Sequence, residues 1–217
     1  MQYSGALQTS RPWWVTIALF MGIASPILFA VIVVVGGLMR PDYSHISQAI
    51  SELTQRGALN KPLLDIGLYI TELMTIAFGF GVLWAVRSAG SSFRISAMLV
   101  VSIALVGLLF GPFPMDPVGE PFTRSGIIHL ILALVSSLGT MAILIFAGLG
   151  WRNVAQGKGW STYSFISFVL VFVTGLLGAM AIARGWTTVG LWQRLSVGVF
   201  LLWKGALAIT LLQRTRP

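Results

Sequence analysis

The sequence predicts an all-α integral membrane protein, a six-transmembrane-helix bundle with a short amphipathic outer helix between spans 1 and 2. Of 217 residues, 56% are hydrophobic and only 9% are charged, which lies outside the usual range of soluble domains. The apolar residues gather into six stretches, each close to the ~20 residues that a helix needs to cross the hydrocarbon core. These stretches are too long for barrel strands, and helices satisfy their own backbone in lipid.

The six spans are expected to form one domain over residues 1–217. They cover residues 13–39, 63–86, 95–113, 125–150, 161–183 and 191–212, and Arg, Lys, Pro or Gly residues bound each of them. Pro26 should kink the first span, and Pro112 with Pro114 should end the third. The first apolar stretch is too long for a signal peptide, so we expect it to be retained.

The longest polar segment, residues 40–62, has its own periodicity. Apolar and polar residues form two opposite stripes at helical spacing, the first made of Ile46, Ala49, Ile50 and Leu53 and the second of His45, Gln48, Glu52 and Gln55. The pattern predicts an amphipathic helix over residues 44–56 at the outer interface. It either shields the bundle or forms a lid whose polar face points into a site.

The charges indicate sidedness. Acidic residues are absent from the N-terminal tail, the second and fourth loops and the C-terminal tail, whose basic residues are Arg11, Arg87, Arg94, Arg152, Lys158, Arg214 and Arg216. The other three loops hold six basic residues and five acids. Counting positive charges predicts that both termini are cytoplasmic, and we expect a multi-pass protein of the bacterial cytoplasmic (inner) membrane. The net charge of +8 flanks apolar spans without a basic run, which argues against nucleic acid as a partner.

Polar residues of the acid-bearing loops converge near one membrane face and predict a site there. The catalytic candidates are His129, Glu52 and Asp116, since a histidine and a carboxylate can perform general acid-base work. The candidate ligand-binding residues of this face are His45, Ser47, Arg124 and Arg194. Each also has a structural interpretation: a packed histidine, a helix cap at Asp116, or an ion pair between Asp116 and Arg124.

Two charged residues, Glu72 and Lys204, lie deeper within predicted spans and complete the ligand-binding candidates. Because ionisable residues in lipid are costly and usually face partners or water, we expect them to approach each other, as a structural ion pair, as the floor of a cavity or as a step of a proton path. The alternative is that Lys204 extends towards the terminal side. We expect neither a metal nor a cofactor, because the chain has no cysteine and no histidine pair at helical spacing.

Four short motifs carry a family resemblance. They are Ser47 to Leu53, the run Phe113-Pro114-Met115-Asp116, Gly126 with His129, and Gln193-Arg194-Leu195. Together they resemble the bacterial membrane family known as domain of unknown function 998. That family is similar in general shape to the Frag1-like six-span proteins, some of which are implicated in lipid remodelling, so the resemblance implies a connection with lipids.

Three functions fit these observations. The first is binding or handling of a lipid or small amphiphile in an outward-facing polar cavity, with membrane lipids as partners. The second is an intramembrane lipid hydrolase or transferase that uses His129 with Glu52 or Asp116. The third is a small transporter or an accessory subunit, for which Glu72 and Lys204 matter more and a membrane-embedded partner protein or a second copy of the chain is expected.

Overall fold

A computed structural model describes residues 11–215, so Arg216 of the basic tail lies outside the described residues. Over this range the chain contains six α-helices, one short 3-10 helix and no strand, which confirms the all-helical prediction. The elements are α1 (Trp13–Leu38), η1 (Ile50–Thr54), α2 (Lys61–Ala85), α3 (Ser91–Gly107), α4 (Arg124–Trp151), α5 (Lys158–Arg184) and α6 (Val189–Arg214). Among these described elements, five helices are long and apolar enough to cross a membrane, and α3 is a shorter apolar helix.

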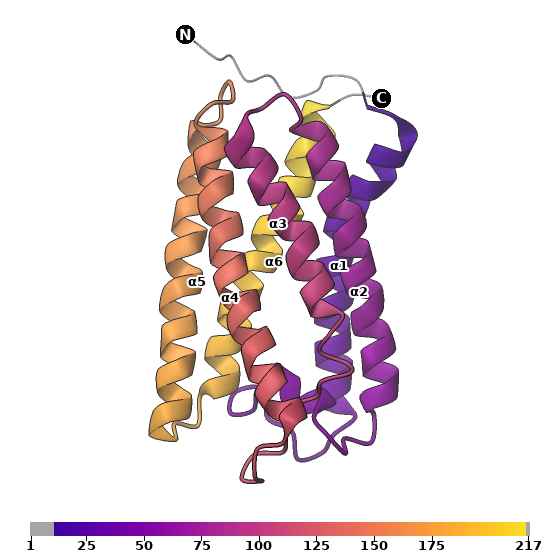
Figure 1. Cartoon of the computed structure of the whole chain (residues 1–217), viewed down its shortest axis with the longest axis vertical. Helices are drawn as coiled ribbons and strands as arrows, with labels where there is room; N and C mark the ends of the chain where they lie inside the picture. Colours follow the sequence, from indigo (N-terminus) through magenta and orange to yellow (C-terminus); the bar gives the residue numbers. More distant parts are fainter. Residues whose placement is uncertain (1–10, 216–217) are drawn as a thin grey trace.

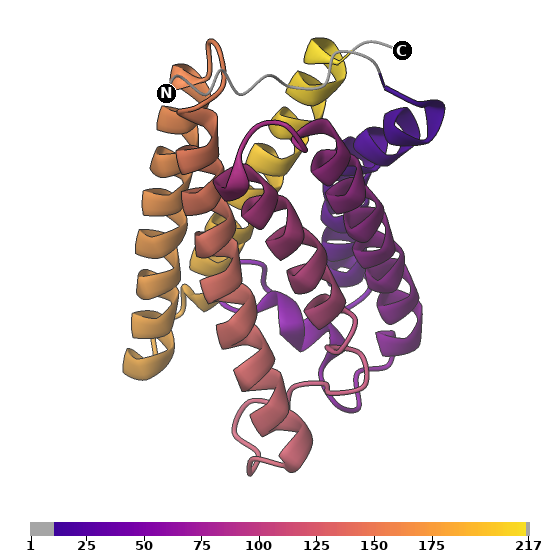
Figure 2. The ribbon, with the colours of Figure 1, turned by 45° about the horizontal axis from the view of Figure 1, so that its top comes forward.

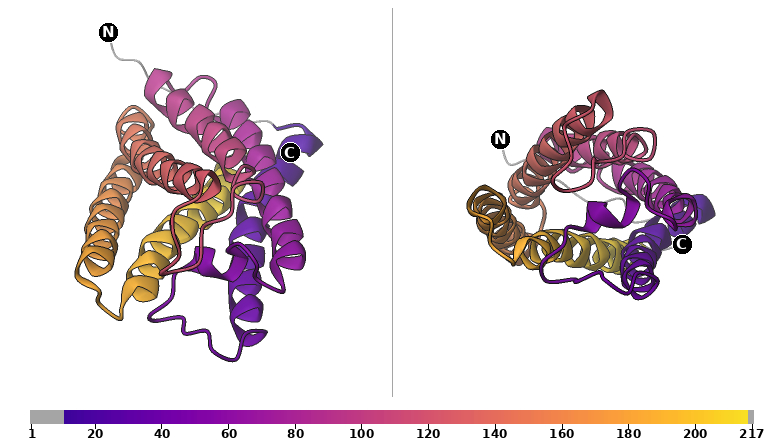
Figure 3. Two further views of the ribbon diagram at one scale, coloured as in Figure 1. Left: turned by 60° about the horizontal axis from the view of Figure 1, so that its bottom comes forward. Right: turned by 90° about the horizontal axis from the view of Figure 1, so that it is seen from below.

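The helices stand upright beside one another (Figure 1) and form a ring when seen from below (Figure 3, right). Each packs against the next along the chain, and α1 packs against α6 to close the ring. Seen from below, η1 lies within the mouth of this ring (Figure 3, right), where it contacts α1, α2 and α6. The chain before α2 therefore closes one end of the bundle.

The two ends of the bundle are held together differently. The main apolar core lies at the upper end of Figure 1, around the fully buried Phe78, Phe93, Trp151 and Trp203. Among residues 11–215, the buried apolar cluster at the lower end is small and consists of Val33, Leu53 and Leu64. Hydrogen-bonded loops therefore supply much of the order at the lower end.

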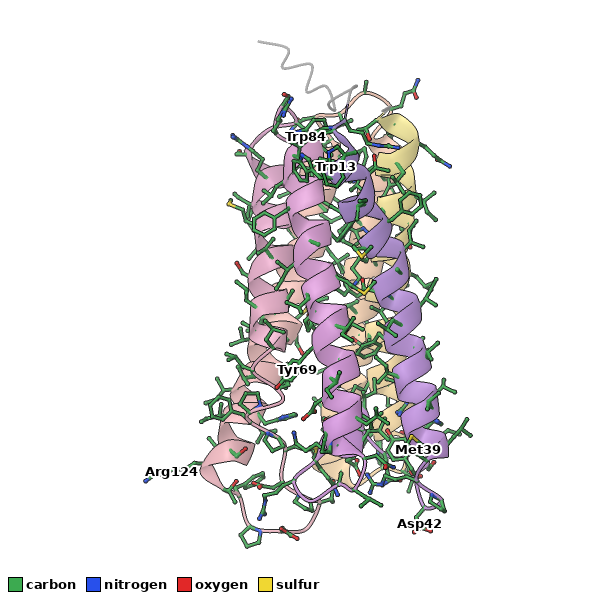
Figure 4. The ribbon with its side chains drawn as sticks, turned by 90° about the vertical axis from the view of Figure 1, so that its right-hand side faces the viewer. Trp13, Met39, Asp42, Tyr69, Trp84 and Arg124 are labelled. Atoms are coloured by element: carbon green, nitrogen blue, oxygen red, sulfur yellow. The ribbon has the colours of Figure 1, made fainter. Side chains whose placement is uncertain are left out.

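Both described chain ends lie at the upper end of the bundle, beside the α2–α3 and α4–α5 connections (Figure 2). The Arg11 guanidinium donates to the carbonyl of Leu212 at 2.6 Å and to the Thr215 hydroxyl at 3.0 Å. Figure 4 shows Trp13 and Trp84 at this end and Met39 and Asp42 at the other. We call the upper end the terminal end and the lower end the acidic end.

The third apolar stretch ends earlier than the sequence predicts. Helix α3 stops at Gly107 rather than near residue 113. After it, the amides of Leu109 and Phe110 bond three residues back, to Val106 and Gly107, which marks tight turns instead of an α-helix. Two prolines follow closely and cannot donate to a helical ladder. A non-helical segment, residues 108–123, therefore completes the acidic end between α3 and α4.

The amphipathic helix over residues 44–56 is reduced to the five residues of η1. The reason lies in the tertiary contacts of the preceding turns. The carbonyl of Ile46 accepts the amide of Leu191, and the carbonyl of Gln48 accepts from Arg194. These carbonyls bond to α6 instead of to amides four residues further on, and Ala49 is extended with ψ 153°. The segment is fixed by its contacts with another helix rather than by its own periodicity.

Candidate functional site

Residues 39–60, here called loop 1, are fastened to the start of α6. The guanidinium of Arg194 donates to the Gln48 carbonyl at 2.8 Å and to the Tyr43 hydroxyl, and lies over the Tyr43 ring. The side-chain oxygen of Gln193 accepts the amide of Ile50 at 2.6 Å. Arg194 Nε is buried without a partner among the described residues. Two neighbouring side chains of α6 thus hold loop 1 over the bundle mouth.

Glu52 is buried, and its hydrogen bonds stabilise the turns of loop 1. Its carboxylate accepts the Ala49 amide at 2.7 Å and the Gln48 side-chain amide at 3.0 Å, while its carbonyl accepts from Arg40 at 2.6 Å. Within residues 11–215 its carboxylate has no hydrogen bond or ion pair with His129 or Arg194. The sequence predicts that these residues converge near one membrane face, but Glu52 makes no direct polar contact with either of the other two.

Asp116 organises the segment before α4. Its carboxylate accepts the backbone amide of Thr123 at 2.7 Å, the Thr123 hydroxyl at 2.8 Å and Arg56 Nε at 3.2 Å. Thr123 in turn caps α4 by accepting the Gly126 amide at 3.2 Å. The backbone amide of Thr123, together with its hydroxyl and Arg56, holds the pKa of Asp116 below its ordinary value of 3.8. Asp116 therefore supports the capping residue, and its cationic partner is Arg56.

Two other candidates, His129 and Arg124, differ in what they contact. His129 is buried, its Nδ1 lies 2.9 Å from the Phe113 carbonyl, and its ring meets the Phe110 ring edge-on. Asp116 lies near enough to His129 to interact with it electrostatically, but among the described residues no hydrogen bond or ion pair joins the two. Arg124, in contrast, is exposed and points away from the bundle (Figure 4).

His45 and Ser47 belong to the turns of loop 1. The His45 ring packs against Gly37 of α1 and meets the Tyr43 ring edge-on at 5.2 Å. Burial, with a contribution from the positive charge of Arg194, lowers the pKa of His45. The amide of Ser47 donates to the Ser44 hydroxyl at 3.3 Å. Both residues shape the turn that Arg194 fastens.

Glu72 and Lys204 lie inside the bundle and interact electrostatically. The described residues contain no ion pair between them within 4.0 Å. Lys204 is 4% exposed and donates to the Thr75 hydroxyl at 2.9 Å. Glu72 lies against the end of α3, since a β-carbon at Gly107 would be 2.5 Å from its Cδ. One turn away on the same side of α2, Tyr69 packs against Gly111 (Figure 4).

The polar residues thus form separate groups rather than one cluster. The part of the chain that the structure describes has no group of three His, Asp or Glu side chains able to hold a metal. Two surface grooves, at the α4–α5 connection and along α5, are lined by no candidate site residue. Sequence reasoning missed Tyr43, Arg56, Thr75 and Thr123 as partners. Only Thr123, a capping residue before an apolar stretch, had a local signal.

Replacing Asp116 by asparagine is expected to lower the melting temperature at neutral pH, on the order of 5 °C, because the charged hydrogen bonds to Thr123 and Arg56 weaken. A carboxyl whose folded pKa is depressed stabilises the fold above its unfolded pKa and loses that contribution as pH falls through the folded value. The difference in melting temperature between wild type and Asp116→Asn should therefore shrink below about pH 4. Tryptophan fluorescence melting in detergent measures both effects.

The control for this prediction is Glu120→Gln. Glu120 is the other carboxylate bonded to Arg56, at 2.7 Å, but it is half exposed, and such surface pairs contribute little. Equal melting temperatures of Asp116→Asn and Glu120→Gln at neutral pH would contradict the assigned role of Asp116.

The fold and its contacts define a class: an all-helical, multi-pass membrane protein with a loop fastened into one end of its helix ring. The chain belongs to the family described as protein of unknown function DUF998, whose model matches residues 23–210. Comparisons with curated proteins and with solved structures give no match.

Proposed function

We propose that this protein binds a lipid or small amphiphile whose polar head reaches Glu72 inside the bundle, beneath loop 1. One observation carries the proposal. The carboxylate of Glu72 lies in a membrane-spanning helix and retains accessible surface, yet it has no hydrogen bond or ion pair with any other described residue. A carboxylate that is costly to place in lipid, and whose interaction with Lys204 is not a direct ion pair, has capacity for a direct contact with a ligand or water.

The contrast with neighbouring charges supports this proposal. Asp65, on the same helix, pairs with Lys61, which also donates to the Gly111 carbonyl at 3.0 Å. Lys204 bonds to Thr75. Glu72 is eleven residues beyond Lys61 in α2, about 16 Å into the helix at 1.5 Å per residue. It is the one carboxylate of α2 whose partner the described residues do not supply.

The early end of α3 supports an approach to Glu72 from the acidic end. Because Glu72 lies against Gly107, the last residue of α3, the non-helical segment 108–123 takes the place of α3 below this level. The few contacts that fasten loop 1 include the hydrogen bonds of Arg194 and Gln193. Entry of a ligand would involve release of these bonds, and loop 1 would act as a lid.

The proposal includes six membrane crossings, in which α3 and the turns after it complete the third. It also includes cytoplasmic termini and an outward acidic end in a bacterial inner membrane. The shared position of the two described chain ends and the basic residues of the terminal end support this orientation.

Binding is favoured over transport because, among the described residues, no buried charged side chain lies beyond Lys204 towards the terminal end. Leu207 and Leu211 of α6 are fully buried there and belong to the main apolar core. Binding is favoured over catalysis because Glu52 and Asp116 are engaged in capping and turn contacts.

Mass spectrometry of the amphiphiles that copurify with the full chain tests the proposal. Wild type is expected to retain a defined amphiphile, and Glu72→Gln is expected to lose at least about fivefold of it, since a charge-assisted hydrogen bond is typically worth more than 1 kcal/mol. The control Glu120→Gln changes an exposed loop carboxylate and should retain the wild-type level. Equal retention by Glu72→Gln, or no amphiphile in wild type, would refute the proposal.

A further inference from the structure

A groove of about 490 Å³ lies at the terminal end, where α4 passes into α5. Its polar lining residues are Arg152, Gln156, Lys158, Ser161 and Thr162, and its apolar lining includes Phe165. Arg152 and Lys158 are exposed, and both stand at the ends of membrane-spanning helices. The groove therefore presents two cations at the level where lipid headgroups are expected.

A second groove of about 380 Å³ continues along the outer face of α5. It is lined by Ile166, Val169 and Leu170, and it shares Thr162 and Phe165 with the first groove. All but Thr162 of its lining residues are apolar. A cationic groove thus leads directly into an apolar one, which is the order of groups in a phospholipid: a charged head followed by an acyl chain.

The cationic groove is held in a fixed shape. Arg214 of α6 donates to the carbonyls of Ala155 and Gln156 at 3.2 and 3.3 Å, and its guanidinium lies over the Trp151 ring. Gln156 adopts a positive φ of 56°, which the surrounding contacts must maintain. The Arg152 guanidinium lies 5.0 Å from the centre of the Phe165 ring. A preformed site loses less entropy on binding.

The charge of this groove selects an anion. All six acidic residues of the sequence, Asp42, Glu52, Asp65, Glu72, Asp116 and Glu120, lie before α4, and none belongs to the connections of the terminal end. The first turn of α5 has no acidic side chain, and no side chain caps it. Its free amides add to the positive potential of Arg152 and Lys158.

We infer that the α4–α5 connection binds one anionic phospholipid of the leaflet at the terminal end. Its phosphate lies between Arg152 and Lys158, and an acyl chain follows Phe165, Ile166 and Val169 along α5. This site is at the opposite end of the bundle from the approach to Glu72, and it does not depend on the proposed function.

Native mass spectrometry of the full chain, titrated with phosphatidylglycerol or phosphatidylcholine of identical acyl chains, tests this inference. Wild type is expected to bind one phosphatidylglycerol at least about tenfold more tightly than phosphatidylcholine, and Arg152→Gln with Lys158→Gln should abolish the preference, because each basic residue near an anionic lipid contributes substantially. Val169→Trp fills the apolar groove without changing the charge of the protein. It should weaken the binding of both lipids.

The matched control is Arg87→Gln with Arg94→Gln, which removes the same charge at the same end from the α2–α3 connection and the first turn of α3. It should keep the preference for phosphatidylglycerol. An equal loss in this control would mean a general surface-charge effect and would overturn the site. Absence of a preference for phosphatidylglycerol in folded wild type would also overturn it. Competition by millimolar sn-glycerol 3-phosphate would overturn it too, because the occupant would then be a soluble phosphate.

Discussion

Replacing Arg194 by alanine is expected to release loop 1 from the bundle and to lower the free energy of unfolding by about 2–5 kcal/mol. The guanidinium bonds to the Gln48 carbonyl, the Gly190 carbonyl and the Tyr43 hydroxyl. Its removal takes one donor from each of these groups in a partly buried place. Because the apolar cluster at this end is small, little else compensates for the loss.

Hydrogen exchange followed by mass spectrometry measures the release directly. Peptides that contain residues 43–50 should exchange much faster in Arg194→Ala, while those of the main core around Phe78 should keep their protection. Arg194→Lys retains the charge but not the forked donor, so an intermediate effect is expected. Arg124→Ala is the control, since Arg124 is exposed and points outward. Unchanged exchange in loop 1 of Arg194→Ala would show that Arg194 does not fasten it.

The helices could be predicted from the sequence because their signal is local. A run of apolar residues long enough for a helix to cross a membrane, bounded by a basic residue or a proline, determines its own secondary structure in lipid. The weakest boundary was that of α3, where hydropathy continues to Phe113 but Gly107, Gly111 and two prolines favour turns. Hydropathy reports burial in lipid, and it does not distinguish a helix from apolar turns packed against one.

Loop 1 shows why the site was harder to predict. Its periodicity is that of an amphipathic helix, yet its carbonyls bond to Leu191 and Arg194, more than 140 residues away. Glu52 and Asp116 were selected as acid-base candidates, but each bonds to backbone amides of its own loop. A sequence shows which residue types are present at one face of a membrane, whereas their partners depend on the tertiary fold.

The electrostatic interaction of Glu72 with Lys204 is expected to appear as strong coupling between their substitutions. Lys204→Met alone should lower the free energy of unfolding by about 3–5 kcal/mol, because it removes the positive charge nearest to a carboxylate inside the bundle. In the double variant with Glu72→Gln, most of that loss should be recovered, since no uncompensated charge remains. Such non-additivity measures the interaction free energy of the two side chains.

Unfolding in mixed micelles with increasing denaturing detergent, followed by tryptophan fluorescence, gives the four free energies of this cycle. Thr75→Val is the control, because it removes the hydrogen bond to Lys204 without changing charge and should cost only about 1 kcal/mol. If the effects of Glu72→Gln and Lys204→Met simply add, the two groups are energetically independent. That result would contradict the interaction of Glu72 with Lys204.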